Sequence, residues 1–525
     1  MKRSLPTFIG TIVLVAGLAG SSADASPPEE RRSGNHAATL DRRSVPGALP
    51  GNPVAYARRK AALNARVRQA WGRVSTVPRT AAAPIAPISW EGVLDPDLTP
   101  PDSTGAIGTT RYIELVNQVY AIYDRFGGPP PTITGTGALQ AFAGAPAADF
   151  VFDPQVIWDP GTDRFYYLMS DFTAAGANMI AWGFSKTNTP SRSKDFCHYF
   201  SSFGYFAPQF GDYPKLGDTQ DFILAGVNVF APAYTQSDVL WVSKPPAGPI
   251  TDCPSIRTFK IGKCQQLKNP DGTLLFTPVP AVQTDDSPTG YVVGTQDLSS
   301  VGFSNYVTVY TVTKVPLTGK AQCRRRGRVF VHTFGIPADA PQTGTPNLLD
   351  TLDGRLEHAV SAVDPLVGGV TIWTAHAVLG GAGSEERWYE INPAALTLAQ
   401  PQGAATNGSL FVWNGAISPD RGAGMFGQSM VMGFNTSSVV TLPDIQMVSK
   451  IGAGAQSGFV PVKGSVGPDM DFTCIPVCRW GDYSGATPDP LPMGATGQVW
   501  LSNQWLAPPV GSTPQWRTWN WEAEP

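Results

Sequence analysis

From Ile88 onward the chain consists of short β-rich runs separated by turn clusters. This pattern restricts the possible folds more than any other feature of the sequence. The turn clusters are rich in Gly, Asp and Pro, and helical periodicity does not persist anywhere in the stretch. Several short strands at such spacing indicate a sandwich, a barrel or a propeller. Similarity between segments of the chain decides among the three.

The repeated unit is a polar or small-residue strand, a Gly/Asp/Pro turn, and an apolar strand that ends in a polar residue. Three clear copies begin at Asp153, at Gly211 and at Gly481. Less regular copies cover residues 104–124, 281–312, 358–390 and 411–434, with long inter-strand loops expected at 253–269 and 315–328. Each unit is a small sheet that cannot bury its faces alone, and radial stacking solves this.

We therefore predict an all-β fold, a seven-bladed β-propeller, with six or eight blades as alternatives. The 14 Trp and 25 Phe provide bulky filling between sheets. Ring closure is expected from residues 88–93, which would pair onto the last unit near residues 516–521.

The first 25 residues have the layout of a signal peptide. Lys2 and Arg3 precede an apolar stretch over residues 5–20, and residues 23–25 offer small residues for cleavage. The apolar stretch is too short and interrupted for a membrane span. We expect a secreted protein, extracellular or periplasmic, without a membrane span.

Residues 26–87 are predicted to be a basic segment separate from the propeller domain, which covers residues 88–525. Residues 26–80 hold eleven Arg and Lys against three acidic residues, and residues 54–74 are expected to form one basic helix. The segment is interpreted as a propeptide or a tether to an anionic surface, or as a solvated linker, which its low apolar content favours. Because the whole chain has a net charge of −3, the body is acidic, which argues against nucleic acid as a partner.

Six cysteines lie in the part predicted to be exported, and an even number in an oxidising compartment indicates disulfides. Proximity in the sequence favours the pairs Cys474/Cys478 and Cys253/Cys264, which leaves Cys197/Cys323. Zinc is disfavoured because no CxxC motif is present.

Common catalytic motifs are absent from the sequence, including Gly-x-Ser-x-Gly, His-Glu-x-x-His, the P-loop and the EF-hand loop. The repeat layout, which includes residues 479–485 (RWGDYSG) followed by 499–501 (VWL), resembles at fold level the secreted sialidase-like propellers over most of residues 90–525. The resemblance implies blades and no particular reaction. The chain lacks the Ser-x-Asp-x-Gly-x-Thr-Trp boxes of sialidases, and no set of three arginines can be mapped.

Carboxylates are the most plausible catalytic groups, because glycoside hydrolysis uses two of them and the inner strands of a propeller converge on its axis. Asp153, Asp212, Glu357 and Asp482 lie at or near the starts of units. However, Asp212-Tyr213 and Asp482-Tyr483 occupy the same place in two units. Such recurrence favours aspartates that accept backbone N–H bonds at a strand entrance.

A charged cluster that no other unit repeats is formed by Arg355, Glu357 and His358. Glu357 is a candidate acid or base whose pKa Arg355 or His358 would adjust, and an ion pair between blades is the alternative. Arg479 would hold a carboxylate ligand or bridge blades. Tyr213 and Tyr483 complete the candidate ligand-binding residues.

No cofactor is evident. Calcium is a candidate because Asp95, Asp97 and Asp102 form one oxygen cluster and Asp469 and Asp471 a second, with solvated turns as the alternative. The leading functional hypothesis is a propeller that binds an extracellular ligand, in the first place a glycan, at one end of its central channel. A glycoside hydrolase or lyase with paired carboxylates and a protein-interaction scaffold are the alternatives, so catalysis and oligomeric state are left open.

Overall fold

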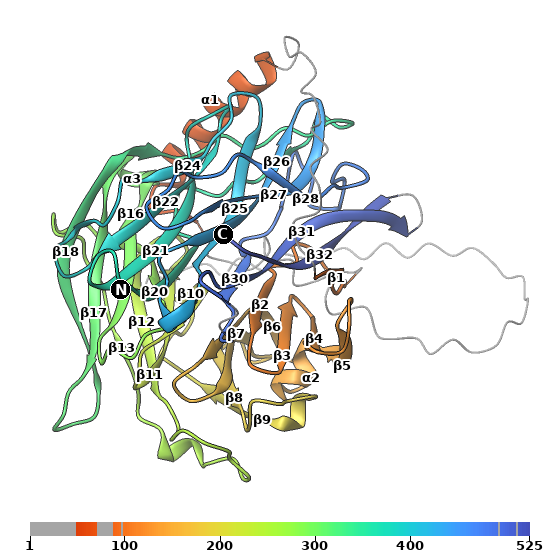
Figure 1. Cartoon of the computed structure of the whole chain (residues 1–525). Coiled ribbons are helices and arrows are strands. Elements are labelled where there is room, and N and C mark those ends of the chain that lie inside the picture. Colours follow the sequence, from red (N-terminus) through yellow and green to blue (C-terminus); the bar gives the residue numbers. More distant parts are fainter. Residues whose placement is uncertain (1–48, 71–87, 96–97, 492–493, 511–512) are drawn as a thin grey trace, which may run out of the picture.

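The computed structural model describes residues 49–70, 88–95, 98–491, 494–510 and 513–525, so the predicted signal peptide lies outside the described residues. Seven antiparallel sheets stand around a common axis (Figure 1). Each sheet contains at least four strands; in the first six blades the earliest of the antiparallel strands lies nearest the axis, and in the seventh the strand over Gly485–Pro488 does. The predicted seven-bladed propeller is confirmed.

The first three blades are simple four-stranded meanders. From the axis outward, the first blade contains β2 (Thr104–Ile107), β3 (Arg111–Val116), β4 (Val119–Asp124) and β5 (Thr132–Ala138). The second contains β6 (Phe150–Asp159), β7 (Arg164–Phe172), β8 (Asn178–Ser185) and β9 (Phe196–Ser201). The third contains β10 (Phe210–Asp218), β11 (Phe222–Phe230), β12 (Tyr234–Ser243) and β13 (Ile261–Cys264).

Blades four to six follow the same order, and the fifth has extra edge strands. The fourth blade contains β14 (Leu275–Pro280), β16 (Gly290–Gln296), β17 (Phe303–Lys314) and β18 (Ala321–Gly335). The fifth contains β20 (His358–Asp364), β21 (Gly369–Val378) and β22 (Glu385–Asn392); β23 (Thr397–Leu398) and β24 (Gly403–Ala405) both pair with β22, and β15 (Val282–Gln283) lies parallel to β20. The sixth contains β25 (Phe411–Pro419), β26 (Met430–Ser438), β27 (Thr441–Lys450) and β28 (Val460–Lys463).

The seventh blade closes the ring with strands from both ends of the propeller domain. It contains β30 (Gly485–Pro488), β31 (Val499–Val510), β32 (Thr513–Ala523) and, outermost, β1 (Ser89–Glu91). Ser89 pairs with Trp521 and Glu91 with Trp519, which confirms the predicted closure. On the inner side the seventh and first blades approach closely, because a Cβ at Gly485 would lie 2.7 Å from the backbone nitrogen of Gly105.

Each of the seven predicted units overlaps one blade. The fourth, at 281–312, begins after the inner strand β14 of its blade, and the sequence-based interpretation also missed outer strands. The segments expected to be loops at 253–269 and 315–328 contain β13 and the first half of β18. These outer strands are partly or fully exposed and therefore lack the apolar alternation that marks a half-buried strand.

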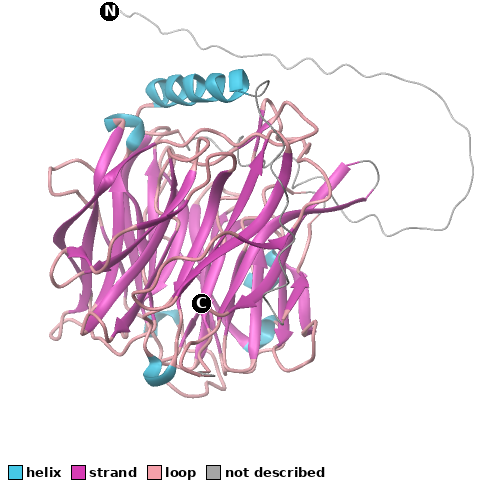
Figure 2. Cartoon of the chain, turned by 45° about the horizontal axis from the view of Figure 1, so that its top comes forward, coloured by secondary structure: helices cyan, strands magenta, loops and turns pink. Residues whose placement is uncertain are grey.

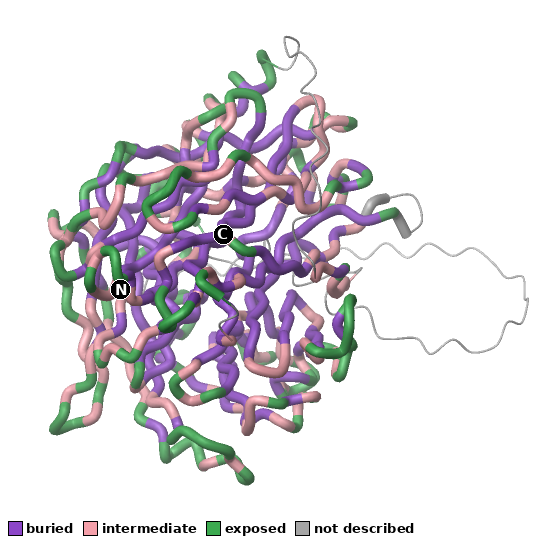
Figure 3. Tube along the Cα trace, viewed as in Figure 1, coloured by how far each residue is buried: buried purple, intermediate pink, exposed green. Residues whose placement is uncertain are grey.

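Separate apolar layers fill the spaces between neighbouring blades. Between the seventh and first blades, for example, Trp90 and Trp500 pack against Tyr112 and Tyr123. Each of the other six interfaces has its own cluster of buried side chains, so the core is a ring of layers. Figure 3 shows buried backbone running along the strands and exposed backbone gathered at the turns.

Helices are few among the described residues: α1 (Pro53–Ala70), α2 (Leu139–Ala143) and α3 (Leu298–Val301). Helix α1 begins one residue before the predicted range of 54–74 and lies across one end of the ring (Figure 2). It docks through polar groups: the Lys60 amine lies 2.5 Å from an Asp339 carboxylate oxygen, and Asn64 donates a hydrogen bond of 2.7 Å to Asp339. The interpretation of residues 26–87 as a propeptide, tether or linker stays a prediction, as does the division at residue 87.

Three disulfides are present, and two of the three expected pairings are wrong. Cys474 pairs with Cys478 as predicted, but Cys197 pairs with Cys253 and Cys264 with Cys323. Proximity in the sequence misled because Cys264 and Cys323 lie on β13 and β18, the outermost strands of adjacent blades.

A short parallel pair of strands, β19 (Leu348–Leu349) and β29 (Val477–Cys478), lies beside the Cys474–Cys478 bridge. No described helix is long and apolar enough to cross a membrane.

Candidate functional site

A narrow cavity lies on the propeller axis where six of the inner strands converge. Its cavity volume is about 20 Å³, which is room for about one water molecule, and the atom-free space reaches about 410 Å³ only when solvent at its mouth is included. Besides apolar side chains and glycines, its wall carries polar side chains from several blades and the segments that lead into them: Thr104, Gln155, Lys215, Glu357, His358, Ser484 and Thr487.

Four inner strands carry a β-bulge at the same level beside this cavity. In each, one residue has a positive φ and the next is proline or glycine: Asp153-Pro154 (φ 53°), Tyr213-Pro214 (φ 58°), Thr277-Pro278 (φ 48°) and Asn414-Gly415 (φ 56°). A bulge interrupts the alternation of a strand and re-aims its side chains. Left-handed backbone at a non-glycine residue costs free energy and gathers at functional sites.

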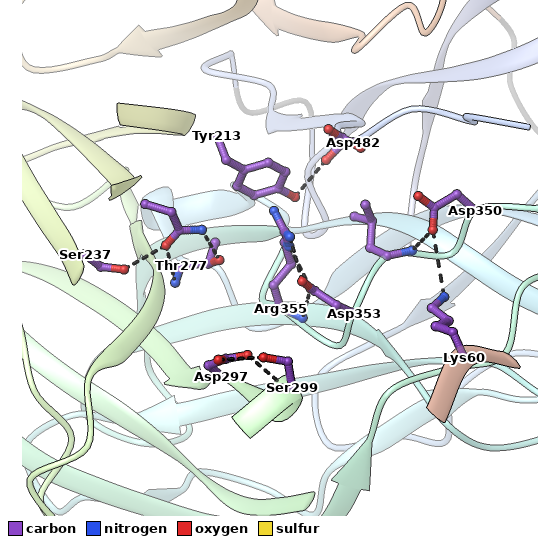
Figure 4. Close-up of polar contacts among 12 residues, drawn as sticks. Lys60, Tyr213, Ser237, Thr277, Asp297, Ser299, Asp350, Asp353, Arg355 and Asp482 are labelled. Carbon is purple, nitrogen blue, oxygen red and sulfur yellow. Dashed lines mark hydrogen bonds and ion pairs between the residues drawn. The ribbon is translucent and has the colours of Figure 1, made fainter. Parts of the chain in front are cut away.

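The two tyrosines predicted to bind ligand stack on each other at the end of the cavity. Their ring centroids are 4.8 Å apart and their planes differ by 22°. The Tyr213 hydroxyl donates to the backbone carbonyl of Asp482 at 2.9 Å, and the Tyr483 hydroxyl donates to the Asp153 carboxylate at 3.0 Å (Figure 4 shows the first contact). Both rings are buried, so neither offers an open face to solvent.

Lys215 is the feature that sequence reasoning missed. Its Nζ lies 4.0 Å from the ring centroid of Tyr483 and 4.5 Å from that of Tyr213, and the residue is 3% exposed. Among the described residues no hydrogen bond or ion pair reaches Nζ. Burial lowers the pKa of Lys215 to about 7, and Glu357 opposes this shift more strongly than any other nearby charge. The two ring faces also favour the charged form.

Glu357 occupies the same cavity, as predicted for an axial carboxylate. Its two oxygens accept backbone N–H bonds from Ala377 (3.1 Å) and Gly415 (2.8 Å). Burial raises the pKa of Glu357 to about 7, although these hydrogen bonds and Lys215 hold it down. An acid and an amine that both titrate near neutrality therefore line one cavity.

A second carboxyl group, Glu386 on β22, lies behind Gly415 and was also missed. It is fully buried, and neither carboxyl oxygen has a hydrogen-bond partner among the described residues. Burial and the charge of Glu357 raise its pKa well above the ordinary value. A Cβ at Gly415 would lie 2.5 Å from Glu386 Oε1, so glycine is required for the two carboxyl groups to approach.

The predicted arginines make ion pairs within the network around the tyrosines. Arg355 binds Asp353 through two hydrogen bonds of 2.7 and 2.6 Å, and its guanidinium lies 4.3 Å from the Tyr213 ring centroid (Figure 4). Arg479 contacts Asp482 at 3.0 Å, and the Asp482 N–H donates to Asp102 at 2.7 Å. Both ion pairs join residues two or three positions apart in the sequence, and a ligand-binding role for these arginines stays a prediction.

The remaining candidates are divided between the cavity and its surroundings. His358 lines the cavity, bonds the Ile417 carbonyl through Nδ1 at 2.8 Å, and is neutral near pH 7 because burial lowers its pKa to about 4. Asp153 and Asp482 lie in the network around the tyrosines. Asp212 is buried on β10 and is not part of the cavity wall.

The two aspartate groups expected to hold calcium are engaged with protein donors where the structure describes them. Asp102 accepts from Asn117 at 2.8 Å, Asp471 accepts from Thr99 at 2.6 Å, and Asp97 lies outside the described residues. In the described part of the chain, one trio of metal-ligand types meets closely, Asp469, Cys474 and Cys478, and its two sulfurs form a disulfide. Calcium stays a prediction.

No family model matches the chain, and no curated protein matches it. Among solved structures it is similar to a hypothetical selenium-binding protein from Sulfolobus tokodaii (10% identity, 68% of this chain, 76% of that one, TM-score 0.38). It is also similar to an exo-β-1,3-galactanase from Clostridium thermocellum (10% identity, 72% and 81%, TM-score 0.30) and to a neuraminidase-like protein of A/flat-faced bat/Peru (9% identity, 85% and 92%, TM-score 0.32). The predicted resemblance to sialidase-like propellers is thus one of fold alone.

Proposed function

We propose that this protein binds a glycan at the mouth of the axial cavity. The observation that supports this is the presence of the Lys215 amine and the Glu357 carboxyl group in one cavity lined by several blades.

The chemistry of the wall suits a polyhydroxylated ligand. Each sugar hydroxyl both donates and accepts hydrogen bonds. Lys215 would donate to such hydroxyls and Glu357 would accept from them, while the hydroxyls of Thr104, Ser484 and Thr487 can do either. Because the tyrosine rings stack on each other, recognition would rest on hydrogen bonds rather than on an open aromatic face.

We infer that the protein works outside the cytoplasm. Three disulfides join all six cysteines, and such bonds persist in oxidising compartments. The signal-peptide layout of the first 25 residues supports the same proposal.

A second candidate, glycoside hydrolysis, is favoured by one observation. Glu357 has a pKa raised to about 7 and a second carboxyl group, Glu386, beside it. A carboxylic acid that keeps its proton near neutral pH can act as a general acid on a glycosidic oxygen. Full burial of Glu386 would restrict it to a supporting role.

A glycan array probed with the full chain tests the proposal, followed by assays for sugar release from the retained glycans. Glu357→Gln should lower retention at least about 10-fold, which corresponds to about 1.4 kcal/mol. Glu91→Gln is the matched control, because Glu91 lies on the outer strand β1 and pairs with Arg517. Equal retention by Glu357→Gln and wild type would contradict the proposed site, and sugar release by wild type alone would establish the hydrolase.

A further inference from the structure

We propose that Lys215 captures small aldehydes reversibly as a Schiff base in the axial cavity, with Glu357 as the proton donor. This goes beyond glycan binding and does not depend on it. The ligand class is a carbonyl compound small enough to reach the amine.

The surroundings of Lys215 do not satisfy an ammonium group. An ammonium has three N–H donors, yet no described residue accepts a hydrogen bond from Lys215 Nζ. Buried donors without acceptors are costly. Burial therefore favours the neutral amine, whose lone pair is the nucleophile that Schiff-base lysines use.

A second lysine in the same molecule shows that burial alone is not the cause. Lys244 is equally buried, but its Nζ lies 2.7 Å from carboxylate oxygens of both Asp159 and Asp218. These two carboxylates hold its pKa above the ordinary value. Lys244 is thus a fixed cation, whereas Lys215 is a buried amine that faces a cavity.

The same surroundings suit the imine product. A protonated imine keeps one positive charge but has only one N–H, so it needs one acceptor in place of three. The faces of Tyr213 and Tyr483 lie within cation–π distance of Nζ and would stabilise that charge. The Glu357 carboxylate would balance it electrostatically.

The reaction balances with the groups present. The Nζ lone pair attacks the carbonyl carbon and the C=O π electrons move to oxygen, which gives a carbinolamine after proton transfer from nitrogen to oxygen. Protonated Glu357 gives its proton to the carbinolamine hydroxyl, which leaves as water while the C=N bond forms. The products are a protonated imine, one water and the Glu357 carboxylate, and hydrolysis reverses every step.

The test uses the full chain with glycolaldehyde and sodium cyanoborohydride, which reduces protonated imines to stable secondary amines. Peptide mass spectrometry then follows three lysines of the wild-type protein: Lys215, the buried and ion-paired Lys244, and Lys314, which pairs with Asp221 at 2.8 Å but has a side chain that is 50% exposed. We expect Lys215 to be labelled at pH 7 at least about 10-fold faster than Lys314, because burial leaves about half of Lys215 neutral at that pH, and Lys244 to stay unlabelled.

The pH dependence and two variants sharpen the test. Labelling of Lys215 should reach half its maximum near pH 7, where the amine loses its proton. Glu357→Gln should slow labelling of Lys215, and Lys215→Arg should abolish it at that position. If Glu357→Gln does not fold, the comparison of labelling at Lys215, Lys244 and Lys314 in the wild-type protein still tests the inference.

Absence of a Lys215 adduct while Lys314 is labelled would overturn the inference. So would labelling of Lys215 that does not level off above about pH 7. Neither result would touch the proposed function, because a glycan can be retained on the array without forming a covalent bond. Conversely, a Lys215 adduct without glycan retention would support this inference and contradict the proposed function.

Discussion

Lys215 and Glu357 are buried ionisable groups whose pKa values move toward each other. Because burial lowers the pKa of Lys215 in the folded state, its charge destabilises the fold fully below about pH 7, and this cost disappears as the pH rises toward the ordinary lysine pKa. Glu357 behaves in the opposite way. Its raised pKa brings no cost below the ordinary glutamate pKa and a full cost above about pH 7.

Replacing Lys215 with methionine should therefore change stability in a pH-dependent way. The free energy of unfolding of Lys215→Met should exceed that of wild type by on the order of 2 kcal/mol more at pH 6 than at pH 10. The reason is that the wild type carries the cost of a buried ammonium only at the lower pH. Denaturant unfolding at both pH values measures this. Lys314→Met is the control, and an equal difference between Lys215→Met and wild type at the two pH values would contradict the assignment.

At the residue scale the sequence located the acid of the site but not its amine. Glu357 stood out because no other unit repeats its charged neighbourhood. Lys215 did not, because the bulge between Asp212 and Lys215 interrupts the alternation of β10. Without the position of that bulge, the face that Lys215 takes cannot be derived from a period of two. Glu386 was missed because its approach to Glu357 depends on the absence of a side chain at Gly415.

At the scale of single elements, helix α1 has one buried ion pair among its contacts with the propeller, which also include Asn64, Arg59 and the buried Val67. Lys60 is 7% exposed and Asp339 is 4% exposed. Removing the amine would leave the Asp339 charge buried without its cation, which typically costs about 3–5 kcal/mol. We expect Lys60→Ala to release α1 from the propeller while the blades stay folded.

Hydrogen–deuterium exchange of residues 53–70 measures that release. Arg58→Ala is the matched control, since Arg58 is an exposed residue of the same helix. Faster exchange in Lys60→Ala alone is the expected result. Unchanged exchange would show that Lys60 does not hold the helix.

The disulfides that close long loops should contribute more to stability than the short one. Cys264–Cys323 closes a separation of 59 residues and Cys474–Cys478 one of 4 residues. Chain-entropy arguments give about 4 kcal/mol for the longer loop and about 2 kcal/mol for the shorter. Replacing each pair with serines and measuring unfolding by denaturant checks this, and a larger loss for the short bridge would contradict it.

Most inner and middle strands have apolar patterns that are visible in the sequence, although the buried β14 lay outside the predicted unit at 281–312. In contrast, β13 and the first half of β18 are partly or fully exposed and lack such a pattern, while buried residues alternate later in β18, at Val329 and Val331. The disulfide Cys264–Cys323 was mispaired for the same reason, because its strands had been taken for loops. The α1 helix was expected, but its docking by Lys60 and Asn64 follows from contacts that its composition does not reveal.

At the scale of the whole molecule, stability depends on closing the ring. Trp90 on β1 packs nearly at right angles to Tyr112, with ring centroids 5.3 Å apart, and is 4% exposed. Trp90→Ala should cost about 3–5 kcal/mol because it opens a cavity between the seventh and first blades. Phe126→Ala, at a residue that is 69% exposed, is the control. Equal midpoints of thermal unfolding for the two variants would argue against closure through β1.

The propeller could be predicted because every blade must repeat the same strand and turn pattern to pack against its neighbours. The site could not be predicted to the same extent, since it joins Lys215 on the third blade to Glu357 at the start of the fifth. A fold also leaves function open, because function belongs to the groups placed on it.

The most direct test of the central claim is the dissociation constant of a glycan retained on the array, measured by calorimetry for wild type, Lys215→Met and Lys314→Met. We expect binding at least about 10-fold weaker for Lys215→Met and unchanged for Lys314→Met. Equal affinity for all three proteins would place the ligand elsewhere and contradict an axial binding site.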